Sequence, residues 1–246
     1  MSERRVVLIT GGNGGIGLGM AQHFYKKGDR VIILDLPEEP SEEASSVVSN
    51  SGGGYWKCDI TNKEEAESVL GEVVNVIGPV DVLINNAGLL KVHSFIETPE
   101  EDLDLMFNVN VKGIYYVTQP IVQSMIDRNQ GVIINMASMG GKEGAPGQSA
   151  YCASKGAVIE LTRVMAMEFG PYNIRVNCLC PGIIETEMGR KNLNDPHEIK
   201  AWIKKSKLGR LGTPNDVAKI AYFLSTDDSD YMTGQSVNVT GGMIMH

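Results

Sequence analysis

The feature that most constrains the fold is a glycine-rich turn near the N-terminus, between a short apolar run and a helical pattern. Residues 4–9 have the length of a strand, and they lead into the turn Thr10-Gly11-Gly12-Asn13-Gly14-Gly15-Ile16-Gly17. Apolar side chains recur at helical spacing in residues 18–27, and the apolar run 31–34 follows as a second strand. Strand, glycine turn, helix and strand in this order predict a βαβ unit.

The glycines of this turn favour a bound pyrophosphate. At Gly11, Gly15 and Gly17 a side chain would keep the backbone away from the phosphates. The helix must also begin close to the first strand, so that its amides point at the anion. Such a turn is typically followed by an acidic residue about 20 positions further on, and Asp35 lies eighteen residues after Gly17. The sequence therefore predicts a dinucleotide-binding unit.

Asp35 also bears on which dinucleotide binds. A carboxylate accepts hydrogen bonds from both hydroxyls of the adenosine ribose, and it repels the 2′-phosphate that distinguishes NADP from NAD. Residues 36–39 contain no Arg or Lys to neutralise that phosphate, and Gly14 stands where a basic side chain could have helped. The sequence predicts NAD, with an ordinary turn or capping aspartate as the alternative interpretation of Asp35.

Strand and helix patterns alternate along the whole chain of 246 residues, 42% of which are hydrophobic. The further strands expected are 55–60, 80–84, 132–138, 174–179 and 236–239; the further helices expected are 62–77, 99–123 and 151–169, with a solvated loop and helix at 38–51. No linker, repeat or low-complexity segment interrupts them. The pattern predicts one α/β domain over residues 1–246, with a seven-stranded parallel sheet doubly wound by helices on both faces.

Polar or small residues follow several predicted strands at the points where those strands end. They are Asp35, Asp59, Asn86, Ser138 and the pair Pro181-Gly182. Because ligands of parallel α/β sheets lie at the carboxyl ends of the strands, we expect these residues to share one binding edge.

A tyrosine and a lysine stand four residues apart in a predicted helix, at Tyr151 and Lys155. This spacing puts both side chains on one face of the helix. A free tyrosine titrates near pH ~10, so a tyrosine that moves protons near neutrality needs a cation that favours the phenolate. By hypothesis Lys155 is that cation, and Ser138 completes a proton-transfer site. The alternative is a surface Tyr/Lys pair without a catalytic role.

Composition excludes several other classes of function. The net charge of −8 and the absence of a basic stripe disfavour nucleic acid as a partner. No apolar stretch approaches 18 residues, and the N-terminus has no signal-peptide pattern, so we expect a cytoplasmic protein without a membrane partner. The cysteines have neither metal-ligand nor redox spacing, which predicts buried free thiols and no metal site. They are Cys58, Cys152, Cys178 and Cys180.

Over nearly its whole length the sequence resembles the short-chain dehydrogenase/reductase family, whose members have a single-domain Rossmann fold. The matching motifs occur in the family's order along the chain. They are Thr10-Gly11-x-x-x-Gly15-x-Gly17, Asn85-Asn86-Ala87-Gly88, Asn110 within residues 108–113, Ser138, Tyr151-x-x-x-Lys155, Asn177, and Pro181-Gly182 with Thr186.

The resemblance implies a catalytic tetrad. Ser138 would bind the substrate oxygen, and Tyr151 would donate or remove its proton. Lys155 would bind the nicotinamide ribose and favour the phenolate, and Asn110 would hold a water that relays protons from Lys155. Hydride would move at the nicotinamide ring.

The same resemblance implies a set of residues that line the NAD site together with Gly11, Gly15, Gly17, Tyr151 and Lys155. They are Asn13, Ile16, Asp35, Asp59, Ile60, Asn86, Ala87, Gly88, Pro181, Gly182, Ile184 and Thr186. Alternatively, Asn86 and Gly88 serve turn chemistry only, and Asn110 is a mid-helix amide that bends its helix.

A homotetramer is also implied, formed through helices at 102–128 and 151–169 and through the C-terminal strand. One departure from the family pattern affects this last contact. Residues 239–242 are Val-Thr-Gly-Gly, whereas Val-Asp-Gly-Gly is more frequent in the family.

Substrate contacts are expected from residues 89–94, from residues 139–148 and from a lid at about 186–207. Polar candidates are His93, Glu143 and Gln148; apolar candidates are Leu90, Met139, Met188 and Trp202. Residues 187–207 contain six basic and three acidic side chains. This excess favours either a solvated helix face or attraction to a phosphate or an acidic carrier protein.

The first expectation for function is an NAD-dependent oxidoreductase acting on a secondary alcohol or ketone, with a sugar, a polyol or a related hydroxy compound as the small-molecule substrate. The alternative is a 3-oxoacyl-[acyl-carrier-protein] reductase, a related enzyme type that generally uses NADPH. A second alternative is a non-catalytic dinucleotide-binding regulatory protein. The presence of all four tetrad residues speaks against that last class, because a binder needs no proton relay.

Overall fold

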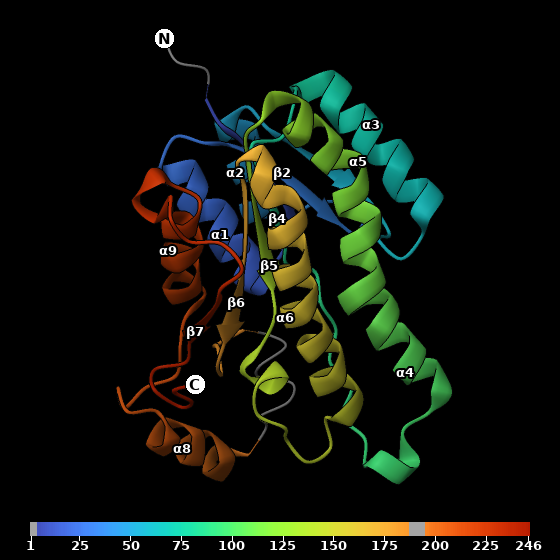
Figure 1. The fold of residues 1–246 in the computed structure, drawn as a ribbon. Coiled ribbons are helices and arrows are strands. Elements are labelled where there is room, and N and C mark those ends of the chain that lie inside the picture. Colours follow the sequence, from blue (N-terminus) through green and yellow to red (C-terminus); the bar gives the residue numbers. More distant parts are fainter. Residues whose placement is uncertain (1–3, 187–194) are drawn as a thin grey trace.

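The computed structural model describes residues 4–186 and 195–246, and its centre is a parallel sheet of seven strands (Figure 1). The strands are β1 Val6–Thr10, β2 Arg30–Asp35, β3 Gly54–Lys57, β4 Val82–Asn85, β5 Gly131–Met136, β6 Ile174–Pro181 and β7 Ser236–Val239. Their order in the sheet is β3-β2-β1-β4-β5-β6-β7. The predicted seven-stranded, doubly wound α/β fold is confirmed.

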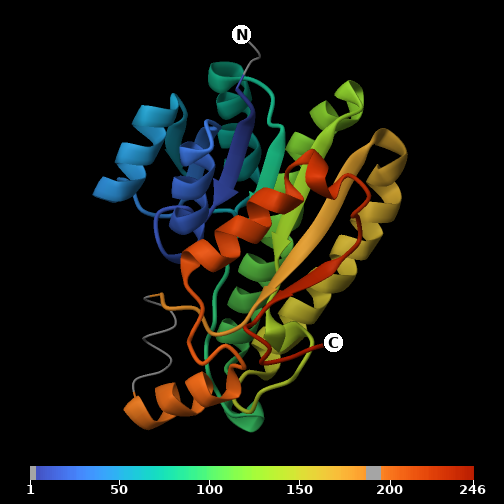
Figure 2. The same ribbon diagram turned by 90° about the vertical axis from the view of Figure 1, so that its left-hand side faces the viewer.

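Helices cover both faces of the sheet, as the views of Figures 1 and 2 show. One face carries α1 Gly15–Lys26, α2 Glu42–Ser51 and α9 Pro214–Leu224; the other carries α3 Lys63–Ile77, α5 Gly113–Arg128 and α6 Ser149–Phe169. Helices α4 Glu100–Phe107 and α8 Pro196–Lys205 lie beyond the carboxyl edge of the sheet (Figure 1). No described helix is both long and apolar enough to cross a membrane.

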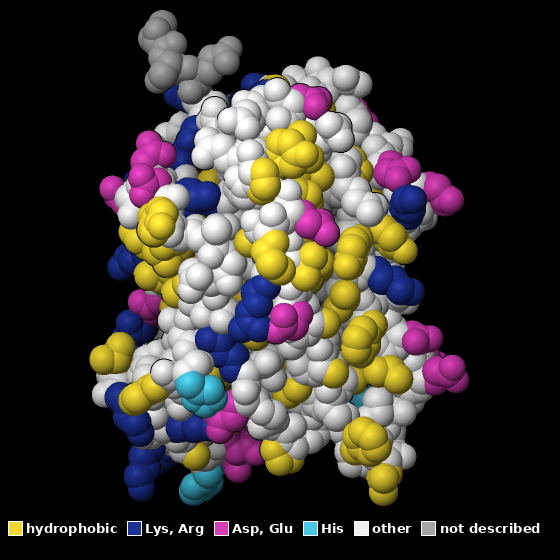
Figure 3. Space-filling view, viewed as in Figure 1, with side chains coloured by type: hydrophobic (Ala, Val, Ile, Leu, Met, Phe, Trp, Pro, Cys, Tyr) yellow, Lys and Arg dark blue, Asp and Glu magenta, His cyan; other side chains and the backbone are white. Residues whose placement is uncertain are grey.

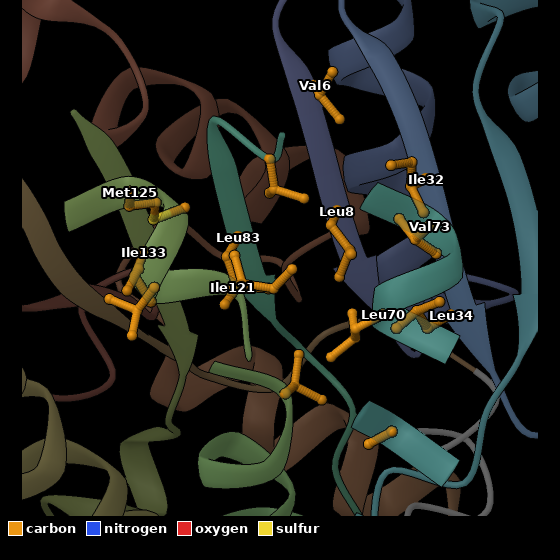
Figure 4. Close-up of a cluster of buried hydrophobic side chains, with 14 of the residues drawn as sticks. Val6, Leu8, Ile32, Leu34, Leu70, Val73, Leu83, Ile121, Met125 and Ile133 are labelled. Atoms are coloured by element: carbon orange, nitrogen blue, oxygen red, sulfur yellow. The ribbon is translucent and has the colours of Figure 1, made fainter. Parts of the chain in front are cut away.

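The core consists of two apolar layers, one on each side of the sheet. Along β1, Val6 and Leu8 pack on the α3/α5/α6 side, whereas Val7 and Ile9 pack on the α1/α2/α9 side. Figure 4 shows the first of these layers. A parallel sheet covered on both faces requires strands that are apolar at successive positions, which explains why the strand runs could be recognised in the sequence. Of the four free cysteines, Cys152 is half-buried and the other three are buried.

The structure differs from the prediction at three helical segments. The single helix expected at 99–123 is divided into α4 and α5 by a π-turn over Asn108–Lys112. Helix α9 was not predicted at all, although Pro214 at its first position and a capping box between Thr213 and Asp216 mark its beginning. Helix α2 is not merely solvated, because its apolar side chains belong to the core; these are Ala44, Val47 and Val48.

Candidate active site

The glycine turn lies at the point where the order of the sheet reverses, with β1 between β2 and β4. Two side chains tie the ends of β1 and β4 together there. The Thr10 hydroxyl accepts hydrogen bonds from the amides of Asn86 and Ala87, both at 3.0 Å. The side-chain amide nitrogen of Asn86, Nδ2, donates to the carbonyls of Thr10 at 3.0 Å and Gly11 at 2.9 Å. Asn86 therefore holds the turn in shape, and Thr10 is a supporting residue that sequence reasoning missed.

The turn leaves no room for side chains on the sheet side and is open on the other. A Cβ atom at Gly17 would lie 2.0 Å from the carbonyl oxygen of Gly11, whereas one at Gly14 would meet nothing within 4 Å. Helix α1 begins at Gly15, three residues earlier than predicted, and has neither a capping side chain nor an acidic residue in its first turn. Its free N-terminal amides thus suit a phosphate group. The residues present fit a dinucleotide.

A pocket of about 350 Å³ borders this turn. It is lined by Gly15, Leu18, Gly19, Gln22, Glu185, Thr186 and Pro214. The methyl group of Thr186 lies 3.6 Å from the position of a Cβ atom at Gly15. The loop after β6 therefore lies against the beginning of α1, beside the predicted cofactor site.

Asp35 lies half-buried at the end of β2, and each of its oxygens accepts one backbone hydrogen bond. Oδ2 accepts from the amide of Asn13 at 2.9 Å, and Oδ1 from the amide of Leu36 at 2.8 Å. A carboxylate oxygen can accept a second bond, so turn chemistry and ribose binding are compatible at this residue. The Asn13 side chain accepts from the amide of Ser41 at 2.6 Å and donates to the Glu39 carbonyl at 3.4 Å, which anchors the loop after β2.

Several other predicted cofactor residues make contacts within the protein itself. Asp59 accepts two hydrogen bonds from Thr61, through its amide and its hydroxyl, so it shapes the turn after β3. The side chains of Ile60 and Ile184 are buried in the core and leave only backbone for a ligand. Gly182 donates its amide to the carbonyl of Val239 at 3.1 Å, which joins the loop after β6 to β7.

The structure brings three of the four tetrad residues together at the carboxyl edge. Ser138 follows β5, and its side chain is hydrogen-bonded to Tyr151 in the first turn of α6. The ammonium of Lys155 lies 5.8 Å from the centre of the Tyr151 ring. It donates to the carbonyl of Met136 at 2.8 Å, which ties it to the end of β5. Tyr151 and Lys155 therefore share one face of α6, as their spacing predicted.

Two glycines allow the elements that carry the predicted tetrad to approach so closely. A Cβ atom at Gly141 would lie 2.7 Å from the carbonyl group of Lys155, so the turn after Ser138 packs backbone against backbone on α6. A Cβ atom at Gly88 would lie 3.1 Å from the Lys155 nitrogen and 3.3 Å from Asn110 Oδ1. Gly88 thus allows the loop after β4 to lie against Lys155 and Asn110 of the predicted tetrad. Its role is therefore not limited to turn chemistry, the alternative interpretation of this residue.

Asn110, the fourth tetrad residue, lies in the π-turn between α4 and α5 and is buried. Its Oδ1 accepts from the Leu89 amide at 2.8 Å, and its Nδ2 donates to the Leu89 carbonyl at 3.0 Å and to the Ser154 hydroxyl at 2.9 Å. Ser154 in turn donates to the carbonyl of Tyr151 at 2.7 Å. Both Nδ2 hydrogens are therefore engaged, and the side chain of Asn110 links the β4 loop to α6. Sequence reasoning missed Ser154.

The direction of the pKa shift at Tyr151 differs from the sequence-based hypothesis. Burial raises the pKa of Tyr151 above its ordinary value, and the hydrogen bond with Ser138 lowers it only in part. Lys155 was expected to favour the phenolate, but burial also lowers the pKa of Lys155, to about 8. The Lys155 ammonium lies over the face of the Tyr151 ring and donates its hydrogen bond to the Met136 carbonyl. In this structure the desolvation of the phenol outweighs that charge.

The lowered pKa of Lys155 predicts that the stability of the protein changes with pH. Between about pH 8 and its ordinary value of 10.5, Lys155 is protonated in the unfolded chain and largely neutral in the folded one. Because the unfolded state then binds more protons, the contribution of Lys155 to the free energy of unfolding rises with pH, by about 2 kcal/mol from pH 7.5 to 9.5. Urea unfolding of the wild type and of Lys155→Met at pH 7.5 and 9.5 measures this gain as the change in their difference. Parallel changes in both proteins would contradict it.

The predicted substrate loops meet at the same edge but use several of their polar groups internally. His93 Nε2 lies 2.7 Å from Asp102 Oδ2, and its amide donates to the Gly147 carbonyl at 2.9 Å. Glu143 pairs with Lys205 of α8 at 3.7 Å. Of the predicted lid, residues 187–194, including Met188, lie outside the described residues; Trp202 is half-buried on α8.

Comparison with known proteins agrees with this arrangement. A family model described as enoyl-(acyl carrier protein) reductase matches residues 11–244. The 3-oxoacyl-[acyl-carrier-protein] reductase FabG of Thermotoga maritima is 38% identical over 248 residues, with 99% of each chain covered. The NAD-dependent glycerol dehydrogenase of Listeria innocua is 37% identical, over 97% of this chain and 93% of the relative. A solved structure of NAD+-bound xylitol dehydrogenase has a TM-score of 0.91 and 33% identity, over 97% of this chain and 98% of the other. The chain belongs to the short-chain dehydrogenase/reductase family of oxidoreductases.

Proposed function

We propose that this protein interconverts a ketone and a secondary alcohol with NAD(H), and that its substrate is a 3-oxoacyl thioester, as in a 3-oxoacyl-[acyl-carrier-protein] reductase. The observation that carries the proposal is the group formed by Ser138, Tyr151 and Lys155 at the carboxyl edge of the sheet. The substrate class rests on the FabG relatives at 34–38% identity. These relatives favour the alternative made from the sequence over the polyol that was expected first.

The arrangement of the site suits reduction of a carbonyl. When bound, NADH supplies the hydride. Ser138 holds the carbonyl oxygen by a hydrogen bond, and Tyr151 donates its proton to that oxygen. A phenol whose pKa is raised by burial stays protonated near neutral pH, which is the state that a proton donor needs. Lys155 and Asn110 keep α6 and the β4 loop in register around Tyr151 through their hydrogen bonds.

The choice of NAD(H) rests on Asp35 and its position beside the turn. Asp35 presents a half-buried carboxylate where the adenosine ribose would lie, which favours two free ribose hydroxyls over a 2′-phosphate. The glycerol dehydrogenase relative is named NAD-dependent, and the xylitol dehydrogenase structure contains NAD+. The exposed lysines Lys200, Lys204 and Lys205 of α8 support an acidic carrier as the partner that presents the thioester.

A second candidate function is NAD-linked oxidation of a polyol or another secondary alcohol. Asp35 favours this candidate, because NAD usually serves oxidation, and relatives named glycerol dehydrogenase and cyclopentanol dehydrogenase are 37% and 33% identical. A non-catalytic binding protein remains the third alternative, and the hydrogen bond between Ser138 and Tyr151 speaks against it.

Absorbance at the reduced-nicotinamide band separates these candidates. A 3-oxoacyl thioester would be offered with NADH and with NADPH, and glycerol, xylitol and simple secondary alcohols with NAD and with NADP. We expect the highest kcat/KM for the thioester with NADH. Faster oxidation of a polyol would establish the second candidate. Binding of NADH without turnover of any substrate would establish a binding protein.

We further propose a homotetramer. Apolar side chains gather on the outer surface over α5 and α6 (Figure 3). Tyr115 is 46% exposed, Val164 43% and Met167 70%, and an interface over these helices would bury them. At the C-terminal contact, Thr240, which departs from the family pattern, is buried and donates to the carbonyl of Ile244 at 3.2 Å. Sedimentation velocity of the purified protein tests the tetramer.

A further inference from the structure

A lysine from the neighbouring strand lies beside Asp35. In the register of β2 and β3, Lys57 is the direct partner of Asp35, and the amide of Cys58 donates to the Asp35 carbonyl at 2.8 Å. Partner residues of adjacent strands point to the same face of a sheet, and residues two apart along a strand share that face. Ile33 and its partner Tyr55 pack in the α1/α2 layer, so Asp35 and Lys57 project to the same side.

Acidic side chains outnumber basic ones around Asp35 and Lys57. Lys57 pairs with Glu38 at 2.7 Å, and both side chains are more than half exposed. The Tyr55 hydroxyl donates to the carbonyl of Pro37 at 2.5 Å, which holds the loop of Glu38 over β3. Burial raises the pKa of Tyr55 to about 12, and the negative charges of Asp35, Glu39 and Glu38 contribute to this shift. Lys57 is thus a basic side chain set among these carboxylates, although it lies on β3 and not in the segment 36–39 that follows Asp35.

We propose that Lys57 and Glu38, together with Asp35, determine which adenosine ribose the protein accepts. In the wild type Glu38 holds the Lys57 ammonium, so the carboxylate of Asp35 dominates and a 2′-phosphate is rejected. An exposed ion pair contributes little free energy, so repulsion of the phosphate by the Asp35 and Glu38 carboxylates, rather than loss of the Lys57–Glu38 pair, keeps a 2′-phosphate out. Lys57 is then a latent phosphate ligand that becomes effective once the neighbouring carboxylates are neutralised. This inference rests on the proposed preference for NAD(H).

Measurements of cofactor binding test this role of Lys57 without any substrate. Asp35→Asn keeps an oxygen that can accept from the Asn13 amide, and Glu38→Gln removes the partner of Lys57. The dissociation constants of NADH and NADPH would be measured by fluorescence titration for the wild type, Asp35→Asn/Glu38→Gln, and the triple variant that adds Lys57→Met. Adenosine 2′,5′-bisphosphate and 5′-AMP, as competitors, report on the adenosine end alone.

We expect the double variant to bind NADPH about tenfold or more tightly than the wild type, because the Lys57 ammonium then meets a phosphate without competition or repulsion from the carboxylates of Asp35 and Glu38. Adding Lys57→Met should reverse most of that gain and leave NADH affinity unchanged. The gain should also shrink as salt is added. Arg163→Met is the matched control, since Arg163 forms an exposed ion pair with Glu160 on α6, on the opposite face of the sheet. Arg163→Met should leave the affinities for NADH and NADPH unchanged.

Two outcomes separate this inference from the proposed function. Equal NADPH affinity in the double and triple variants would overturn the role of Lys57, whatever cofactor the wild type prefers. A wild type that binds NADPH better than NADH would overturn the preference for NAD(H). In that case Lys57→Met alone decides the role of Lys57: selective loss of NADPH affinity establishes it as a phosphate ligand, and no loss refutes it.

Discussion

Replacing Tyr151 with phenylalanine should lower kcat by about 10²–10⁴-fold, the range that a positioned proton donor or acceptor contributes. The substitution removes the hydroxyl that is hydrogen-bonded to Ser138 and leaves the ring in place beneath Lys155. The substrate oxygen would then lose the phenol as its proton donor, although the cradle for the dinucleotide would be unchanged. Steady-state kinetics with the preferred substrate measures the loss, and fluorescence titration with NADH should give an affinity within a few-fold of the wild type.

Tyr172→Phe is the control for this prediction. Tyr172 is 42% exposed in the short turn after α6, and it lies outside the proposed site. It should retain wild-type kcat. If Tyr151→Phe kept more than about a tenth of wild-type kcat, Tyr151 would not be the acid or base.

Replacing Gly17 with alanine should disrupt both the stability of the chain and its binding of the dinucleotide. The added Cβ would lie 2.0 Å from the Gly11 carbonyl oxygen and 2.6 Å from the Asn86 amide nitrogen, so the turn and the β4 loop must move apart. Overpacking of this kind costs about 1–3 kcal/mol. We expect an equal loss in the free energy of unfolding, measured with urea in the absence of cofactor. NADH affinity should fall at least about tenfold, because the amides of α1 lose their position.

Gly14→Ala provides the comparison on the same turn. A Cβ atom there meets nothing within 4 Å, and the backbone at Gly14 is extended, with φ at −161°. Its free energy of unfolding should stay within about 1 kcal/mol of the wild type. Equal destabilisation by the two alanines would show that close approach at Gly17 does not govern the turn.

Predictability differed between kinds of element. Strands such as β1 and β5 were recognisable because apolar runs bounded by turns are what a sheet buried on both faces requires. Helix α9 escaped notice, although its capping box was visible in the sequence. The π-turn at Asn110 was not predictable from spacing, because it forms where the Asn110 side chain bonds to Leu89 and Ser154, on two other parts of the chain.

By itself the sequence determined the α/β class, the glycine turn, the acid at the end of β2 and the shared helix face of Tyr151 and Lys155. All of these depend on short-range spacing, since side-chain direction repeats every two residues in a strand and about every four in a helix. Only the tertiary structure decided what these groups meet. It placed Lys57 beside Asp35 through strand register, joined Asn86 to the turn, and made burial dominate the pKa values of Tyr151 and Lys155. Register, burial and contacts between distant segments depend on how the whole chain packs, and no local pattern encodes them.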